Sequence, residues 1–268
     1  MSSSDLLEVE GVTTGFGSNT VLHDLGFSVR QGEIAAILGL NGAGKSVTMK
    51  AIAGIVPVWQ GRITLAGHDI TDMQAEDRVA AGMAHVPQGR QVFPELTVEQ
   101  NLRLGAYALR RRDKSRYSAV LDSVYQRFKV LEERRNQLAG SMSGGQQAAL
   151  AVARALMAEP KLILVDEASA GLSPIMVTEV FEVLKKVNES GVTILMVEQN
   201  VSISLKVADR AFILQSGQIV YQGEIAELDQ DRVADHLGVG KLLRSSINKA
   251  ADSRKPASKV QAPSRKAR

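Results

Sequence analysis

The sequence contains no cysteine. Disulfides, thiolate metal sites and thiol chemistry are therefore excluded, and a reducing compartment is compatible with this composition. The 268 residues include no uninterrupted apolar run of about 18 residues, so we expect no membrane-spanning helix. The first residues, Met1–Asp5, carry no basic stretch that leads into an apolar one, so we also expect no secretion signal.

The chain has little net charge, but the charge is unevenly distributed. Residues 241–268 hold nine Lys or Arg and one acidic residue, so their net charge is +8 and the overall +3 leaves −5 on residues 1–240. The basic character thus belongs to the tail, and we expect no nucleic-acid binding by the rest. The tail has little to bury and is expected to be disordered; attraction to anionic lipid is the alternative interpretation.

A glycine-rich loop, Gly39–Ser46, follows the apolar run Ile34–Leu38 and precedes a segment expected to be helical through Ile52. Strand, glycine loop and helix in this order predict phosphate binding, because backbone N–H groups must approach phosphate oxygens closely and the helix N-terminus favours anions. Lys45 is expected at the β- and γ-phosphates and Ser46 at Mg²⁺. The expected nucleotide-binding residues here are Gly39, Leu40, Asn41, Gly42, Ala43, Gly44, Lys45, Ser46 and Val47.

Two acidic residues and a small-residue motif complete the candidate chemistry. Asp166 follows the apolar run Leu162–Val165 and is expected to hold the same Mg²⁺, whereas Glu167 is the candidate base for an attacking water. Ser143–Gln146, with the sequence Ser-Gly-Gly-Gln, precedes a helical pattern and forms a second candidate anion site.

The periodicity of the chain indicates one α/β core with a helical insert. Short strands and glycine turns are expected between Val9 and Val29, helices between Gln88 and Gly140, and an α/β alternation again from Leu162. Thr97–Gln100 fits a capping box at one helix start.

These motifs in this order resemble the ATP-binding cassette (ABC) family over residues 6–240. The resemblance implies a P-loop, RecA-like ATPase core with an N-terminal antiparallel β subdomain and a helical subdomain at about residues 89–158. In this family Ser143–Gln146 would bind the γ-phosphate of ATP held by the opposite subunit. Phe16 would stack on adenine, and Gln88 would contact Mg²⁺ and the attacking water.

Two stretches, 88–102 and 197–201, are similar to the LivF-type subunits of bacterial branched-chain amino acid importers. Gln199 stands where the wider family places a histidine at the γ-phosphate, and it is assigned to the catalytic group with Glu167 and Gln88. The resemblance implies a second, LivG-type cassette, two membrane permeases, a periplasmic binding protein, and a peripheral position on the cytoplasmic face of the inner membrane. Urea or short-chain amides remain alternative cargoes. A soluble ABC ATPase unconnected with membranes and a non-hydrolysing, ATP-gated module remain alternative functions.

Overall fold

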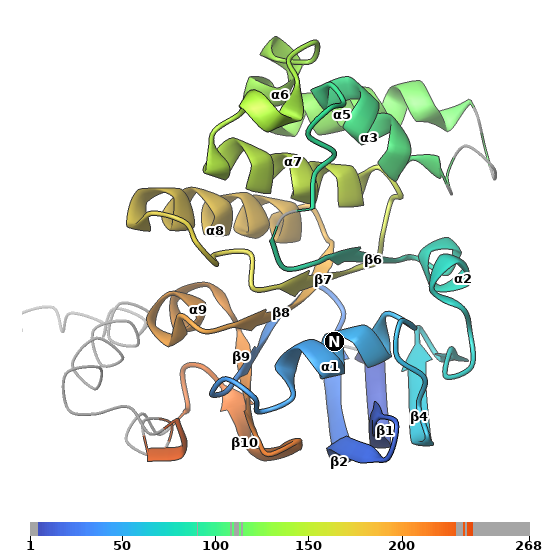
Figure 1. Cartoon of the computed structure of the whole chain (residues 1–268), viewed down its shortest axis with the longest axis vertical. Helices are drawn as coiled ribbons and strands as arrows, with labels where there is room; N and C mark the ends of the chain where they lie inside the picture. Colours follow the sequence, from blue (N-terminus) through green and yellow to red (C-terminus); the bar gives the residue numbers. More distant parts are fainter. Residues whose placement is uncertain are drawn as a thin grey trace, which may run out of the picture.

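The computed structural model describes residues 5–89, 91–107, 109, 113, 115–228, 233 and 235–237. The expected domain end at residue 240 and the basic tail, 241–268, lie outside these residues. Within them the chain forms two sheets, at the lower end and the middle of Figure 1. The smaller is antiparallel, in the order β2-β1-β4-β5. Its strands are β1 (Asp5–Phe16), β2 (Asn19–Arg30), β4 (Gln60–Leu65) and β5 (His68–Asp69).

The larger sheet has the order β10-β9-β3-β8-β7-β6, in which only β10 runs antiparallel to its neighbour. Every residue of β3, β7 and β8 is buried, as expected for apolar strands covered on both faces. The strands are β3 (Ile34–Leu38), β6 (Met83–Val86), β7 (Leu162–Asp166), β8 (Thr193–Glu198), β9 (Arg210–Gln215) and β10 (Gln218–Glu224).

The alternation of side chains along β3 divides the interior into two cores. Ala35 and Ile37 face the antiparallel sheet and α1 (Lys45–Ile52). Ala36 and Leu38 face the opposite way, toward a core that includes residues of the helical insert and of three helices in the second half of the chain. These helices are α7 (Gly144–Leu156), α8 (Pro174–Glu189) and α9 (Val201–Val207).

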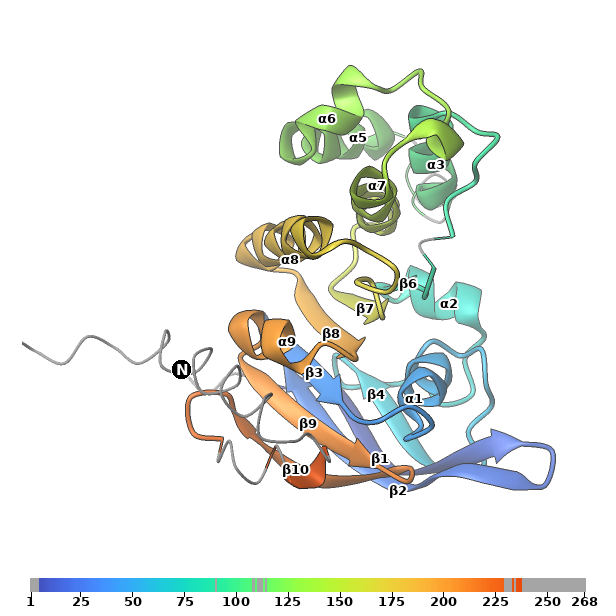
Figure 2. The same ribbon diagram turned by 60° about the vertical axis from the view of Figure 1, so that its left-hand side comes forward.

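The helical insert lies at the end of the molecule away from the antiparallel sheet, as both Figure 1 and Figure 2 show. Besides α7 it contains α3 (Val98–Gly105), α5 (Arg116–Arg127), α6 (Lys129–Glu133) and the 3-10 turn η1 (Ala139–Ser141). The short helix α2 (Ala75–Ala80) lies outside it and precedes β6. Among the described residues, no helix is long and apolar enough to cross a membrane.

The predicted α/β fold with its antiparallel β subdomain and helical insert is confirmed. The capping box also forms: Thr97 accepts from the Gln100 N–H while Gln100 accepts from the Thr97 N–H. Between Val9 and Val29, however, two 12-residue strands replace the expected short ones. Register shifts between β1 and β2 explain the difference, because bulges let a strand continue past glycines that read as turns in the sequence.

Candidate active site

The carboxyl ends of four neighbouring parallel strands build the site. Because β3, β8, β7 and β6 are adjacent and parallel, the segments that follow them emerge at one edge of the sheet. These segments are the glycine loop 39–46, Gln199, Glu167 and Gln88. Residues from four distant parts of the sequence therefore meet at this edge.

The glycine loop requires glycine at specific positions. Gly42 and Gly44 have φ values of +81° and +108°, in the region that side chains disfavour. A Cβ on Gly39 would lie 2.4 Å from the carbonyl oxygen of Leu214 on β9. The Gly217 N–H also donates to the Ala43 carbonyl at 2.9 Å, so the β9–β10 turn holds the loop in place.

Lys45 begins α1, and its ammonium group lies within the loop. The Lys45 side chain is buried, and its Nζ donates to the carbonyls of Gly39 at 2.9 Å and Leu40 at 3.2 Å. It lies 3.9 Å from Glu167 Oε1. Burial lowers the pKa of Lys45, while the carboxylates of Glu167 and Asp166 oppose that effect.

Ser46 and Asp166 offer oxygen ligands that fit Mg²⁺. The Ser46 hydroxyl donates to Asp166 Oδ1 at 3.3 Å, and Asp166 is 3% exposed. Burial, then the charge of Glu167, raises the pKa of Asp166, so a divalent cation here would favour its ionised form. No cluster of three or more His, Cys, Asp or Glu suited to a metal occurs among the described residues. The Ser–Asp pair instead suits an ion that also uses water and phosphate oxygens.

Glu167 is held between two side-chain amides. Its Oε2 accepts from Gln88 Nε2 at 2.7 Å, and Gln199 Nε2 lies 2.9 Å from both of its oxygens. The Glu167 backbone has a φ of +46°, and its N–H donates to Val197 on β8 at 2.9 Å. Amides orient a carboxylate without competing for protons near neutral pH, so this arrangement suits a group that accepts a proton or positions water.

Glu198 is a site residue that the sequence reasoning missed. It is 1% exposed, and its two oxygens accept from the Ser169 N–H at 3.2 Å and the Ser169 hydroxyl at 2.5 Å. Burial raises its pKa. Glu198 therefore anchors the loop after Glu167. The available signal was an acidic residue at the end of an apolar strand, whereas the sequence patterns at residues 197–201 pointed to Gln199 and not to Glu198.

The structure does not bring Ser143–Gln146 into this group. Ser143 caps α7 through a second capping box, in which it accepts from the Gln146 N–H and Gln146 accepts from the Ser143 N–H. Helix α7 packs with α3 and α8, on the side of the sheet opposite α1. Gly145 approaches α8 closely, since a Cβ there would lie 2.9 Å from Glu179 Oε2. Another molecule can therefore reach the exposed Ser143.

Phe16 lies at the end of β1, at the β1–β2 hairpin, and is 54% exposed. An exposed aromatic side chain here is available for stacking on a base. The hairpin closes tightly, because a Cβ on the neighbouring Gly15 would lie 2.0 Å from the Asn19 carbonyl oxygen.

A family model described as ABC transporter matches residues 22–170. The chain is 41% identical to the "high-affinity branched-chain amino acid transport ATP-binding protein BraG" of Pseudomonas aeruginosa, over 80% of this chain and 91% of BraG. It is 34% identical to the "probable branched-chain amino acid transport ATP-binding protein LivF" of Archaeoglobus fulgidus, over 88% of this chain and 99% of that relative. It is 31% identical to the "lipopolysaccharide export system ATP-binding protein LptB" of Haemophilus influenzae, over 89% and 99%.

Solved structures show the same fold. An ATP-binding cassette of an ABC transporter in its ADP conformation superimposes with a TM-score of 0.79 at 27% identity, covering 89% of this chain and 100% of that one. A nucleotide-free cassette gives 0.77 at 26% identity, covering 90% and 98%. The family model spans more than half of the chain and agrees with the fold described above. This chain therefore belongs to the ABC transporter family, as an ATP-hydrolysing cassette.

Proposed function

We propose that this cassette is the LivF-type subunit of an importer of branched-chain amino acids. The observation that carries the proposal is the 41% identity to BraG, which extends over most of both chains. Gln199 in place of the family's usual histidine supports the same subgroup. The relatives named for lipopolysaccharide export are less similar, at 31% identity, so import is the better-supported direction.

The site supports the following division of roles in ATP hydrolysis. The loop 39–47 binds the phosphates. Lys45 neutralises charge on the γ-phosphoryl group as this group is transferred to water. Glu167 orients and deprotonates the attacking water, while Gln88 and Gln199 hold its carboxylate in position. Phe16 supports the adenine. When bound by Ser46, Asp166 and Gln88, Mg²⁺ would neutralise charge on the β- and γ-phosphates.

A second subunit would complete the nucleotide site. Ser143, Gly144, Gly145 and Gln146 lie apart from Lys45 within this chain, so they are available to the ATP of a partner cassette, and the partner's equivalent motif to the ATP held here. Residues 6–240 would form this nucleotide-binding domain, with residues 89–158 as its helical subdomain. We infer a LivG-type cassette as that partner and a heterodimer as the assembly.

Exposed apolar side chains support docking to permeases. Phe93, which follows Gln88, is 48% exposed; Leu104 and Tyr107, at the end of α3, are 46% and 67% exposed. Large apolar side chains gathered on one part of a surface mark a protein contact. Two permeases, and a periplasmic binding protein acting through them, would place this chain at the cytoplasmic face of the inner membrane.

Three alternatives remain open. Importers of urea or short-chain amides would use the same ATPase, because ATP hydrolysis at this site does not depend on the chemistry of the cargo. A soluble cassette ATPase would lack the permeases. A non-hydrolysing module would not need Glu167, but the structure holds Glu167 between two amides, which favours hydrolysis.

Uptake of radiolabelled leucine tests the proposal. Cells that lack this gene should regain leucine uptake when given the wild-type chain, but not when given Lys45→Ala. Lys50→Ala, on the same helix, is the matched control and should restore uptake. Competition by unlabelled isoleucine and valine, but not by urea or acetamide, is expected. Normal leucine uptake without the gene, or competition by urea alone, would overturn the cargo assignment.

A further inference from the structure

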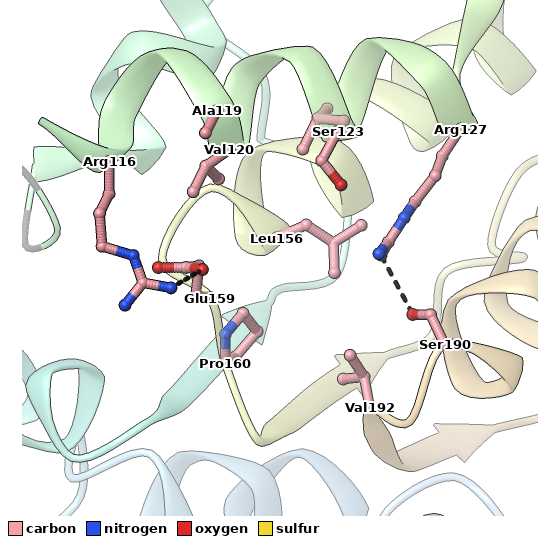
Figure 3. A pocket seen from close by; sticks show the side chains of 11 residues that line it. Arg116, Ala119, Val120, Ser123, Arg127, Leu156, Glu159, Pro160, Ser190 and Val192 are labelled. Atoms are coloured by element: carbon pink, nitrogen blue, oxygen red, sulfur yellow. Dashed lines mark hydrogen bonds and ion pairs between the residues drawn. The ribbon is translucent and has the colours of Figure 1, made fainter.

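A cavity of about 300 Å³ lies between the helical insert and the core, far along the chain from the nucleotide loop. Helix α5 forms its roof, and the turn between α7 and β7 and the segment before β8 form its floor and wall (Figure 3). This volume is at the small end of ligand sites, so any occupant must be small.

One end of the cavity carries a carboxylate with spare hydrogen-bonding capacity. Glu159 Oε1 accepts from Arg116 Nη2 at 2.7 Å, which ties the start of α5 to the core. Within the described part of the chain, Glu159 Oε2 is buried and accepts no hydrogen bond. Glu159 also has a φ of +50°, an uncommon backbone conformation for a residue with a side chain. The Glu159 side chain is 30% exposed, and Arg116 uses only part of the hydrogen-bonding capacity of its carboxylate, which therefore suits a ligand with a cationic donor.

The other end carries a guanidinium group and hydroxyls. Arg127, three turns along α5 from Arg116, donates to Ser190 Oγ at 3.1 Å. This single contact uses one of its five N–H donors. Ser123 lies on the same side of α5, between the two arginines, and lines the cavity (Figure 3). An arginine beside hydroxyl groups is suited to a carboxylate.

Aliphatic side chains line the space between these polar ends. Val120 and Val124 contribute from α5, Leu156 from the end of α7, and Val192 from the segment before β8. Burying a branched aliphatic group against them would be favourable, at roughly 0.8 kcal/mol per CH₂. The cavity thus presents a cation acceptor, an anion donor and an apolar middle.

We propose that this cavity binds an aliphatic α-amino acid, as a regulatory site for the transporter's own product. The ligand's ammonium group would meet the exposed part of the Glu159 carboxylate, its own carboxylate would meet Arg127 and Ser123, and its side chain would lie on Val120 and Leu156. That the ligand is the imported product rests on the proposed function. The chemical match between an aliphatic amino acid and the residues that line the cavity does not rest on it.

The position of the cavity explains how a ligand would affect turnover. Leu156 ends α7, the helix that begins beside Ser143. Glu159 lies in the turn that follows, and β7 then runs from Leu162 to Asp166 at the nucleotide site. A ligand that fixes α5 against this turn therefore holds the helical insert in one orientation to the core. Product bound in that state would lower ATP turnover.

Equilibrium dialysis of the purified full-length chain against radiolabelled L-leucine tests the site directly. Saturable binding at millimolar or lower concentration, displaced by isoleucine, is expected. 4-Methylpentanoate is leucine without the ammonium group and isopentylamine is leucine without the carboxylate, so both should displace leucine roughly tenfold less well or worse. Absence of saturable binding would overturn the proposal, as would equal displacement by all three compounds.

Variants with matched controls separate the cavity from the rest of the surface. Glu159→Gln and Arg127→Gln should each weaken leucine binding roughly tenfold or more, since a charge-assisted hydrogen bond is lost. Glu133→Gln and Arg103→Gln change exposed residues elsewhere on the helical insert. These two variants should bind leucine as the wild type does. Ala119→Phe should fill the cavity, whereas Ser118→Phe on the same helix should not. Retained ATP binding shows that each variant is folded.

The same measurements distinguish failure of the site from failure of the proposed function. If leucine is imported but does not bind this chain, the regulatory site is wrong and the importer assignment stands. If leucine binds and Ala119→Phe abolishes the binding, but another compound is imported, the site stands and the cargo assignment fails. In the assembled transporter, leucine on the nucleotide side should lower ATPase activity, and Ala119→Phe should remove this inhibition.

Discussion

At the scale of single residues, the position of Glu167 follows from its neighbours in space and not from its neighbours in sequence. Gln88 and Gln199 lie 79 and 32 residues away in the chain, and both donate to its carboxylate. A histidine in place of Gln199 could exchange protons, whereas an amide can only orient. We therefore propose that Glu167 alone takes up the proton at this site.

Replacement of Glu167 by Gln tests that assignment. The change keeps the size of the side chain but removes its basicity, so ATP hydrolysis by the assembled transporter should fall roughly 10²- to 10⁴-fold while ATP still binds. Single-turnover hydrolysis and filter binding of ATP measure the two quantities. Glu179→Gln, on α8, is the control. Unchanged hydrolysis by Glu167→Gln would remove Glu167 from the role of base.

Glu198 sets a different, structural prediction. The pKa of Glu198 in the folded protein is raised above the ordinary value of 4.5. Glu198 therefore contributes fully to the free energy of unfolding only below about pH 4.5, and this contribution is lost as the pH rises through the pKa of the folded state. Glu198→Gln keeps two hydrogen bonds to Ser169 without a buried charge. It should therefore raise Tm at neutral pH by roughly 2–4 °C, which corresponds to about 1 kcal/mol.

The pH dependence provides the check on Glu198. The gain in Tm should shrink as pH falls toward 4.5, where the wild-type carboxyl becomes protonated. Glu189→Gln, an exposed change at the end of α8, should alter Tm little at any pH. A Glu198→Gln protein that is less stable than the wild type at neutral pH would mean that the charge itself stabilises the loop.

At the scale of elements, strand β6 contains a half-buried histidine that we expect to make the fold sensitive to acid. Burial, with a smaller effect of Lys50, lowers the pKa of His85 to about 4, and His85 Nε2 is buried without a hydrogen-bond partner in the described part of the chain. Between pH 6.5 and 4 the unfolded chain binds a proton that the folded chain does not. The free energy of unfolding should therefore fall across this window, by about 3 kcal/mol from this residue.

His85→Leu should remove most of that decrease. Urea unfolding at a series of pH values between 4 and 7 measures it, and His68→Leu, an exposed change on β5, should leave the decrease in place. Equal acid sensitivity in His85→Leu and the wild type would show that His85 remains able to take up a proton in the folded state.

The N-terminus of α7 carries a capping box and, as we propose, also binds a partner's phosphate; one pair of substitutions separates the two roles. Ser143→Asp retains a side chain that caps the helix but adds a negative charge where a partner's phosphate would bind. Tm should change little, while ATPase activity of the assembled transporter should fall roughly tenfold or more. Thr97→Asp makes the same change at the capping box of α3 and should leave activity intact. Equal activity in both variants would separate Ser143 from the phosphate.

The sequence predicted elements well where one short pattern determines them. The run Ile34–Leu38 forms a strand, the glycines after it form a loop, and the capping box forms at Thr97, as predicted; the second capping box, at Ser143, was not predicted. Strand β6 and the pair β9–β10 were not predicted. Most residues of β6 and β9 are buried whereas none of β10 is, so no single local pattern marks these three strands. The interactions around Glu167 and Glu198 are likewise set by strand order, which no local pattern contains.

At the scale of the whole molecule, one sheet separates the two nucleotide-binding elements of the chain. Helix α1, with Lys45, packs on one face, and α7, with Ser143 at its start, packs beyond the other. In the proposed assembly, a single copy would therefore have half of each site, and turnover would depend on pairing with a second cassette. The cavity under α5 lies where the helical insert meets the core, so it is placed to affect how the halves approach one another.

The tagged chain can be purified from native membranes in mild detergent and its partners identified by mass spectrometry. This measurement shows most directly whether the chain works with a second, different cassette in a membrane transporter. The account predicts recovery of a second cassette, with a histidine at the position equivalent to Gln199, together with two multi-span permeases. Recovery of the permeases with this cassette alone would contradict the heterodimer and place Gln199 in both sites. Recovery of ribosomes or nucleic acid, with no membrane protein, would contradict the assignment to a transporter.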